Sequence, residues 1–307
     1  MEDLIEFLPI EDMEYEYQFA QLSQTVDWGL SKANIQEFHK ITKGSGIKVA
    51  VLDTGKPIHS DLPDMLGLDT TGENSPVDSQ GHSTHVCGII GARDNDFGIL
   101  GVASEAELMT VKVLGNSGHG GYAGIEAGIR AAIDEGVDII NMSLGAPVEP
   151  PASFHQAIID ATNNGIIIVA AAGNDSGAVN WPARYPEVIA VGAIDENGNL
   201  ADFSSRGTEV SVVAAGVNIY STYLNNQYAV LKGTSQASPF IAGICALLLA
   251  KDRLENPNAY KITSVQAMLE ALDVICDQNG RFNTIGKEGN FGFGIPKFCN
   301  AYTQPKV

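Results

Sequence analysis

The sequence predicts an α/β fold, with a mostly parallel, doubly wound sheet and helices on both faces. Apolar runs alternate with helical patterns along the chain, and several runs lack a polar and apolar alternation, as expected of strands covered on both faces. The expected strands cover residues 47–53, 108–114, 137–142, 166–172, 188–194 and 210–214. The expected helices cover residues 122–135, 154–164, 235–251 and 264–272.

The helices are predicted from spacing and from their ends. In the first, Ile125, Ile129 and Ile133 recur at helical intervals, and Gly136 follows as a stop. The helix over 154–164 stops in the same way before Gly165. Another apolar helix is expected to begin at His82.

Composition limits the class of protein. The 307 residues carry 18 basic and 37 acidic side chains, a net charge of −19, which disfavours nucleic acid and anionic membrane surfaces as partners. Seven acids and no Lys or Arg precede residue 18, so the basic start of a signal peptide is missing and a cytoplasmic protein is expected. We expect one domain over 23–307, preceded by a leader over 1–22. The four cysteines are sparse, which favours reduced thiols.

Three motifs carry chemistry. They are VAVLDTG at 49–55, GHSTHV at 81–86 and GTSQASP at 233–239. Each places one polar group at the end of a regular element: the carboxylate of Asp53, the imidazole of His82 and the hydroxyl of Ser235. An acid, an imidazole and an alcohol are the groups needed for a neutral hydroxyl to attack a carbonyl.

The first two motifs also have simpler interpretations. Asp53 alone fits a turn, or the ribose-binding acid of an NAD-type α/β enzyme, although no glycine fingerprint or phosphate loop accompanies it. His82 and His85 could be two metal ligands, but no third ligand is evident. The remaining histidines, at 39, 59, 119 and 155, are expected at the surface.

Taken together and in this chain order, the motifs resemble the subtilisin family of serine proteases, closest in character to intracellular subtilisins. The resemblance runs from about residue 24 to about residue 301. It implies a serine endopeptidase that acts on proteins or peptides through an acyl-enzyme, with Asp53 orienting His82 and His82 activating Ser235. Asn174, in the segment Ala171-Ala172-Gly173-Asn174, is implied as the side-chain oxyanion donor.

The resemblance also implies binding residues. Substrate backbone is expected to pair with two segments: Gly118, His119, Gly120 on one side and Ser143, Leu144, Gly145 on the other. The pocket for the side chain before the cleaved bond is expected to be lined by Ala171, Ala172, Gly173 and Asn180. A structural calcium ion is expected on the side chains of Gln24, Asp61 and Asn95 with the carbonyls of Arg93, Phe97 and Ile99.

The leader contains an apolar patch, 5–10, with Pro9 among acids. It resembles the short pro-segment of intracellular subtilisins, so it is expected to inhibit the enzyme until removed; a disordered tail or an edge strand is the alternative. A homodimer is expected by the same analogy. Ser83 and Gln236 depart from the family, which usually has Gly and Met there, and these departures leave open a pseudoprotease that binds peptides without cutting them.

Overall fold

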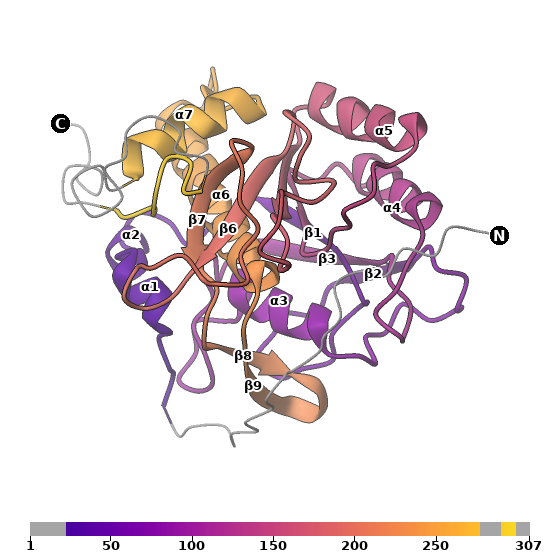
Figure 1. Ribbon diagram of the computed structural model, residues 1–307. Helices are drawn as coiled ribbons and strands as arrows, with labels where there is room; N and C mark the ends of the chain where they lie inside the picture. The colour runs from indigo at the N-terminus through magenta and orange to yellow at the C-terminus, as the bar shows by residue number, and fades with distance from the viewer. Residues whose placement is uncertain (1–22, 277–289, 299–307) are drawn as a thin grey trace.

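The computed structural model describes residues 23–276 and 290–298 (Figure 1). The expected leader therefore lies outside the described residues. The core is a seven-stranded sheet in the order β2-β3-β1-β4-β5-β6-β7, and every neighbouring pair is parallel. Its strands are β1 (Lys48–Asp53), β2 (Leu66–Asp69), β3 (Glu107–Lys112), β4 (Ile139–Met142), β5 (Ile167–Ala171), β6 (Ile189–Ile194) and β7 (Val210–Ala215).

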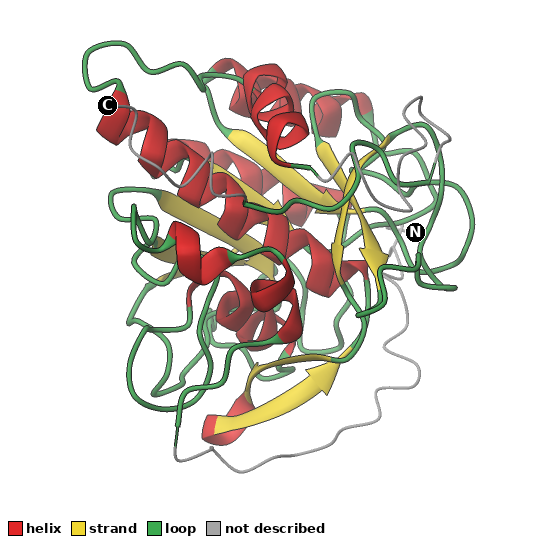
Figure 2. Ribbon diagram, turned by 90° about the vertical axis from the view of Figure 1, so that its left-hand side faces the viewer, coloured by secondary structure: helices red, strands yellow, loops and turns green. Residues whose placement is uncertain are grey.

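Helices cover both faces of this sheet, as the ribbon in Figure 2 also shows. They are α1 (Trp28–Lys32), α2 (Ile35–Phe38), α3 (His82–Gly91), α4 (Tyr122–Asp134), α5 (Ala152–Asn163), α6 (Thr234–Glu255) and α7 (Val265–Ile275). Val49 and Val51 of β1 join the apolar core under α3 and α6, whereas Ala50 and Leu52 join the core under α4 and α5. Successive strand residues point to opposite faces, so one strand contributes to two cores. The predicted fold class is confirmed.

The expected strands lie within two residues of the observed ones, and α6 extends further than expected, to Glu255. The strand β2 and the helices α1 and α2 were not predicted from the sequence. Also not predicted was a separate antiparallel hairpin of β8 (Ile219–Tyr223) and β9 (Gln227–Leu231), joined by the 3₁₀ turn Leu224–Asn226. None of the helices within 23–276 and 290–298 is long and apolar enough to cross a membrane.

The hairpin β8–β9 is fastened to α3 by polar contacts. His85 Nε2 lies 3.1 Å from the carbonyl oxygens of both Ile219 and Ala229. In return, Ser221 Oγ donates to the His85 carbonyl at 2.8 Å and Thr222 Oγ1 donates to the Thr84 carbonyl at 2.7 Å. Because carbonyl oxygens only accept, Nε2 of His85 carries a hydrogen.

The surface placement expected for His59 is wrong. Its side chain is buried, with Nε2 2.9 Å from the Gln227 carbonyl at the start of β9, and its Nδ1 accepts the backbone N–H of Asp61 at 3.1 Å. Its hairpin partner is distant in sequence, which is why local pattern could not reveal it.

Acid should weaken the fold through His85. Burial, and secondly the nearby His82, lower the pKa of His85 to about 3, against the pull of its two carbonyl partners. An unfolded histidine takes its proton near pH 6.5, so this contribution is complete above that pH and is lost as pH falls toward 3. In a Ser235→Ala background, which prevents autolysis, the free energy of unfolding should fall by up to about 1.4 kcal/mol per pH unit below pH 6.

The variant His85→Gln keeps an N–H donor for the two carbonyls but cannot titrate. Denaturant unfolding at pH 7 and at pH 5 should therefore show a smaller pH dependence for this variant. If the free energy of unfolding falls by the same amount between pH 7 and pH 5 in both proteins, His85 is not the source of the pH dependence.

Candidate active site

The site lies at the edge of the sheet where the parallel strands end. Asp53 is the last residue of β1 and is fully buried. His82 begins α3, and its Nδ1 lies 2.8 and 3.0 Å from the two carboxylate oxygens of Asp53. A carboxylate accepts, so Nδ1 carries the hydrogen and Nε2 is left as the basic nitrogen of the ring.

Burial and charge act on His82 in opposite directions. Burial alone lowers the pKa of the imidazole, whereas the charge and hydrogen bond of Asp53, with the charge of Asp78, raise it. The charges prevail, and the pKa of His82 lies above its ordinary value. A ring in this environment accepts a proton readily near neutral pH, as a general base must.

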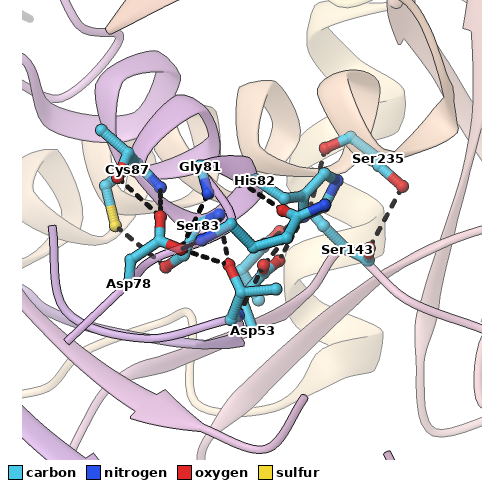
Figure 3. Close-up of polar contacts among 12 residues, drawn as sticks. Asp53, Asp78, Gly81, His82, Ser83, Cys87, Ser143 and Ser235 are labelled. Atoms are coloured by element: carbon cyan, nitrogen blue, oxygen red, sulfur yellow. Dashed lines mark hydrogen bonds and ion pairs between the residues drawn. The ribbon is translucent and has the colours of Figure 1, made fainter. Parts of the chain in front are cut away.

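Ser235 lies on the other side of the His82 ring from Asp53 (Figure 3). It is the second residue of α6, where backbone N–H groups are unpaired by the helix and favour negative charge. Its hydroxyl donates to the Ser143 carbonyl at 3.1 Å. Within the described residues no hydrogen bond joins Ser235 to His82; such bonds often form only when substrate binds.

Pro239 explains how the backbone of Ser235 is held. A proline has no N–H, so the carbonyl four residues earlier in the helix, that of Ser235, loses its usual donor. Ser143 Oγ donates to this carbonyl at 2.9 Å, and Ser143 Oγ itself accepts from Asn141 Nδ2 at 3.0 Å. Ser143, expected only as a substrate-pairing residue, therefore also fixes the turn that carries the hydroxyl.

Asn174 follows β5 and faces the same turn. Its Oδ1 accepts both the backbone N–H of Thr234 at 2.8 Å and the Thr234 hydroxyl at 2.7 Å. The oxygen is thereby occupied, and the orientation of the carboxamide is fixed with Nδ2 as its free end. A Cβ at Gly233 would come within 3.2 Å of this Nδ2, so a glycine keeps space beside it. Thr234 is thus an anchor for Asn174, a role that its sequence pattern did not reveal.

The expected substrate-binding segments reach the same edge. Ser143, Leu144 and Gly145 follow β4, while Gly118, His119 and Gly120 lie in the loop after β3 and are half-buried. Ala171 ends β5, and Ala172 and Gly173 follow it; Asn180 donates its N–H to the Ala172 carbonyl at 2.8 Å. A Cβ at Gly145 would lie 3.3 Å from Asn180 Cβ, so the 143–145 and 171–173 segments meet around Asn180.

The residues expected to bind calcium also come together. Gln24 Nε2 lies 2.7 Å from the Arg93 carbonyl and 3.1 Å from the Ile99 carbonyl. Asp61 is buried and accepts from Asn95 Nδ2 at 2.9 Å, and Asn95 Oδ1 in turn accepts the N–H of Phe97. In the described part of the chain no group of three or more His, Cys, Asp or Glu side chains is placed to hold a metal ion. The oxygen atoms at the Gln24–Asp61–Asn95 position are those of one carboxylate, two amides and backbone carbonyls.

Two further residues were not singled out from the sequence. Thr54 donates its N–H to Asp53 at 2.8 Å and its hydroxyl to Asp78 at 2.9 Å, and both residues are buried. The role of Asp78 could have been inferred from its position in the sequence. An acid in a polar turn just before a helix commonly accepts hydrogen bonds from the first N–H groups of that helix.

This arrangement places a nucleophile, a base, a carboxylate that orients the base and an amide donor around one point, which defines a site for acyl transfer.

Comparison with known proteins agrees with this class of site. The sequence model of the subtilase family matches residues 44–294. The chain is 44% identical over 254 residues to the M-protease of Shouchella clausii (strain KSM-K16), covering 81% of this chain and 67% of that protein.

Two subtilisins are similar at the same level. Subtilisin Savinase of Lederbergia lenta is 46% identical over 233 residues, and Subtilisin DY of Bacillus licheniformis is 46% identical over 241 residues; each alignment covers 75% of this chain and 86% of the relative. The chain belongs to the subtilase family and is a subtilisin-like serine endopeptidase.

Proposed function

We propose that Ser235 is the nucleophile of this endopeptidase, His82 its general base, Asp53 the group that orients His82, and Asn174 its oxyanion donor. The observation that carries the assignment is the bond from His82 Nδ1 to the buried Asp53, with Ser235 on the opposite side of the ring. It leaves Nε2 as the ring atom able to take a proton from the hydroxyl.

Each step balances with these groups. Ser235 Oγ bonds to the carbonyl carbon of the peptide while its proton passes to His82 Nε2. The negative carbonyl oxygen receives hydrogen bonds from Asn174 Nδ2 and from the N–H of Ser235. His82 then returns the proton to the departing nitrogen as the C–N bond breaks, leaving an ester on Ser235. Water, deprotonated by His82, hydrolyses this ester and restores the hydroxyl.

Labelling with a fluorophosphonate probe tests the nucleophile. The wild-type chain should bind the probe covalently at Ser235, as peptide mapping would show, and Ser235→Ala should not react. A folded wild-type chain that remains unlabelled would favour the pseudoprotease alternative, for which Ser83 and Gln236 leave room.

Loss of the Asn174 amide should lower turnover selectively. Asn174→Ala should reduce kcat about a hundredfold with little change in KM, the scale that such a replacement has in subtilisin itself, because the donor acts on charge present only in the transition state. Thr234→Val is the matched control: it removes one of the two donors that hold Asn174 and should cost less. Steady-state kinetics on a peptide anilide measure both, and an unchanged kcat in Asn174→Ala would remove the role.

We propose further that substrate binds as an extended strand between 118–120 and 143–145, with its side chain before the cleaved bond near Asn180. Support comes from the position of both segments after strands at the carboxyl edge of the sheet, and from the hydrogen bond of the Ser235 hydroxyl to the Ser143 carbonyl at 3.1 Å. Backbone pairing accepts many peptide sequences, which suits an endopeptidase.

We propose that a calcium ion binds between Gln24, Asp61, Asn95 and the carbonyls of Arg93, Phe97 and Ile99. The donor set fits the ion, since all of these groups offer oxygen, and the contacts among Gln24, Arg93 and Ile99 bring them together from separate segments. Exchanging the oxygen and nitrogen of the Gln24 carboxamide turns its oxygen toward the same carbonyls. An ion there would fasten the N-terminal segment to the 93–99 loop.

Removal of the ion should destabilise the fold. If calcium is present at about a hundred times its dissociation constant, it adds about 2.7 kcal/mol. A chelator should therefore lower the Tm of Ser235→Ala by several degrees, and added calcium should restore it whereas magnesium should not. Asp61→Asn should show no response to the chelator, and the same Tm with and without chelator in the parent would exclude the site.

We propose that the leader inhibits the enzyme and that the protein acts inside the cell. The leader pairs an apolar patch with acids, and Pro9 fixes φ and lacks an N–H, so it would disturb the pairing that cleavage requires. Cys87 and Cys245 are free and buried thiols, which supports a reducing compartment.

Deletion of residues 1–20 should raise the initial peptidase rate. The full-length Ser235→Ala protein should keep its leader, whereas the wild type should lose it over time, as mass spectrometry would show. Equal initial rates for the full-length and deleted enzymes would refute inhibition.

A further inference from the structure

Asp78 is a buried carboxylate that the triad does not include. It lies in the loop before α3, and only 5% of its surface is exposed. Five donors surround it: Oδ1 accepts from Thr54 Oγ1 and from the N–H groups of Gln80 and Gly81, at 2.9 to 3.0 Å. Oδ2 accepts from the N–H and hydroxyl of Thr84, at 2.9 and 2.6 Å.

All of these partners donate, so this set of five donors, called the cradle below, suits an anion. Three of them are backbone N–H groups: that of Gln80 just before α3, that of the N-cap Gly81, and that of Thr84 in the first turn, where no helical carbonyl is available as an acceptor. The carboxylate therefore holds the first turn of α3, the turn from which His82 projects, and lies beside Asp53 in Figure 3.

Thr54 joins this cradle to the triad. Its N–H donates to Asp53, its hydroxyl donates to Asp78, and the same hydroxyl oxygen accepts the N–H of Ser83 at 3.0 Å. Two carboxylates thus share one residue beneath the helix turn that carries the base.

We propose that Asp78 is a positioning residue of the active site: its fixed negative charge stabilises the His82 imidazolium formed during proton transfer, and its hydrogen bonds set the direction of the ring. This inference rests on the proposed role of His82 as the base.

The charge is effective because it is already in place. Asp78 is held by five donors before reaction, so it need not reorient as His82 gains its proton, and burial leaves little water to screen it. The raised pKa of His82 agrees: burial acts to lower it, Asp53 raises it most, and Asp78 adds to the rise.

The other titratable groups packed around His82 do not replace Asp78. On α3, burial keeps His85 neutral, with its pKa lowered to about 3, and burial raises the pKa of the Cys87 thiol, so it stays protonated. On β3, the buried Lys112 donates to the Thr54 carbonyl at 2.8 Å and pairs with Glu73 at 3.4 Å. The charge of Lys112 is thus paired with Glu73, and Asp53 and Asp78 are the carboxylates that raise the pKa of His82.

The decisive experiment reads the pKa of His82 directly, without catalysis. NMR titration of the His82 imidazole in Ser235→Ala should give a higher pKa than in Ser235→Ala/Asp78→Asn, by about 0.5–1 unit. Ser235→Ala/Thr84→Val is the matched control, since it removes one hydrogen bond of Asp78 but keeps its charge, and it should titrate like the parent. Asp78→Ser, which loses the charge but retains a capping hydroxyl, serves if Asp78→Asn does not fold.

Kinetics of the active enzyme provide the second readout. Asp78→Asn should move the acid limb of kcat/KM to lower pH and reduce kcat about tenfold with KM unchanged. An unshifted titration in a folded Asp78→Asn protein, or an equal shift in Thr84→Val, would overturn the inference. Neither result would affect fluorophosphonate labelling of wild-type Ser235, so failure here is distinct from failure of the proposed function.

Discussion

The hydrogen bond between His82 Nδ1 and Asp53 requires a carboxylate to be held away from water at the end of a buried strand. A buried charge is costly unless hydrogen bonds and an opposite partner offset its desolvation. The parallel sheet offers those partners, because its carboxyl ends meet the beginnings of α3 and α6 at one edge. Thr54 N–H and the imidazole satisfy Asp53, and the layers of α3 and α6 keep solvent from it. The packing that buries Asp53 therefore also holds the hydrogen bond by which Asp53 orients His82.

The position of α3 is set from two sides. Asp78 holds its first N–H groups, while Ser221 and Thr222 of the hairpin donate to carbonyls of the same turn and of the next. The hairpin has its own anchor, since Tyr228 of β9 donates to Asp61 at 3.2 Å. β9 then leads within a few residues to Ser235. The loop proposed to hold calcium, the hairpin, the helix of the base and the turn of the nucleophile are consequently one packed unit.

The hydrophobic pattern along the chain predicted the strands and the residues at the ends of strands and helices, because both depend on neighbours in sequence. The six strands β1 and β3 to β7 were predicted because their apolar runs have both faces covered. Asp53, His82 and Ser235 stood out because each lies at one end of a strand or helix, whereas Asn174 was implied only by the family resemblance. The hairpin β8–β9 was missed because its strands are short and include the polar residues Ser221 and Thr222, whose hydroxyls point at helix carbonyls. The surface placement of His59 was wrong, and the anchoring role of Thr234 was not predicted, for a related reason: their partners, the Gln227 carbonyl and Asn174, lie 168 and 60 positions away. Pairings over such distances follow from the topology, which composition and spacing do not specify.

The polar groups around Ser235 divide into those already satisfied and those left for substrate. The Ser235 carbonyl, released by Pro239, is satisfied by Ser143, and the Asn174 oxygen is satisfied twice by Thr234. What remains unpaired by these contacts is the amide end of Asn174 and the basic nitrogen of His82. A group whose other end is anchored cannot turn away, so it loses little entropy when it meets the reacting atoms. Asn174 Oδ1 and His82 Nδ1 are held by hydrogen bonds, and this directs Asn174 Nδ2 and His82 Nε2 toward the substrate. The need to hold such groups explains why Thr234, Ser143 and Asp78, which lie outside the triad, surround it.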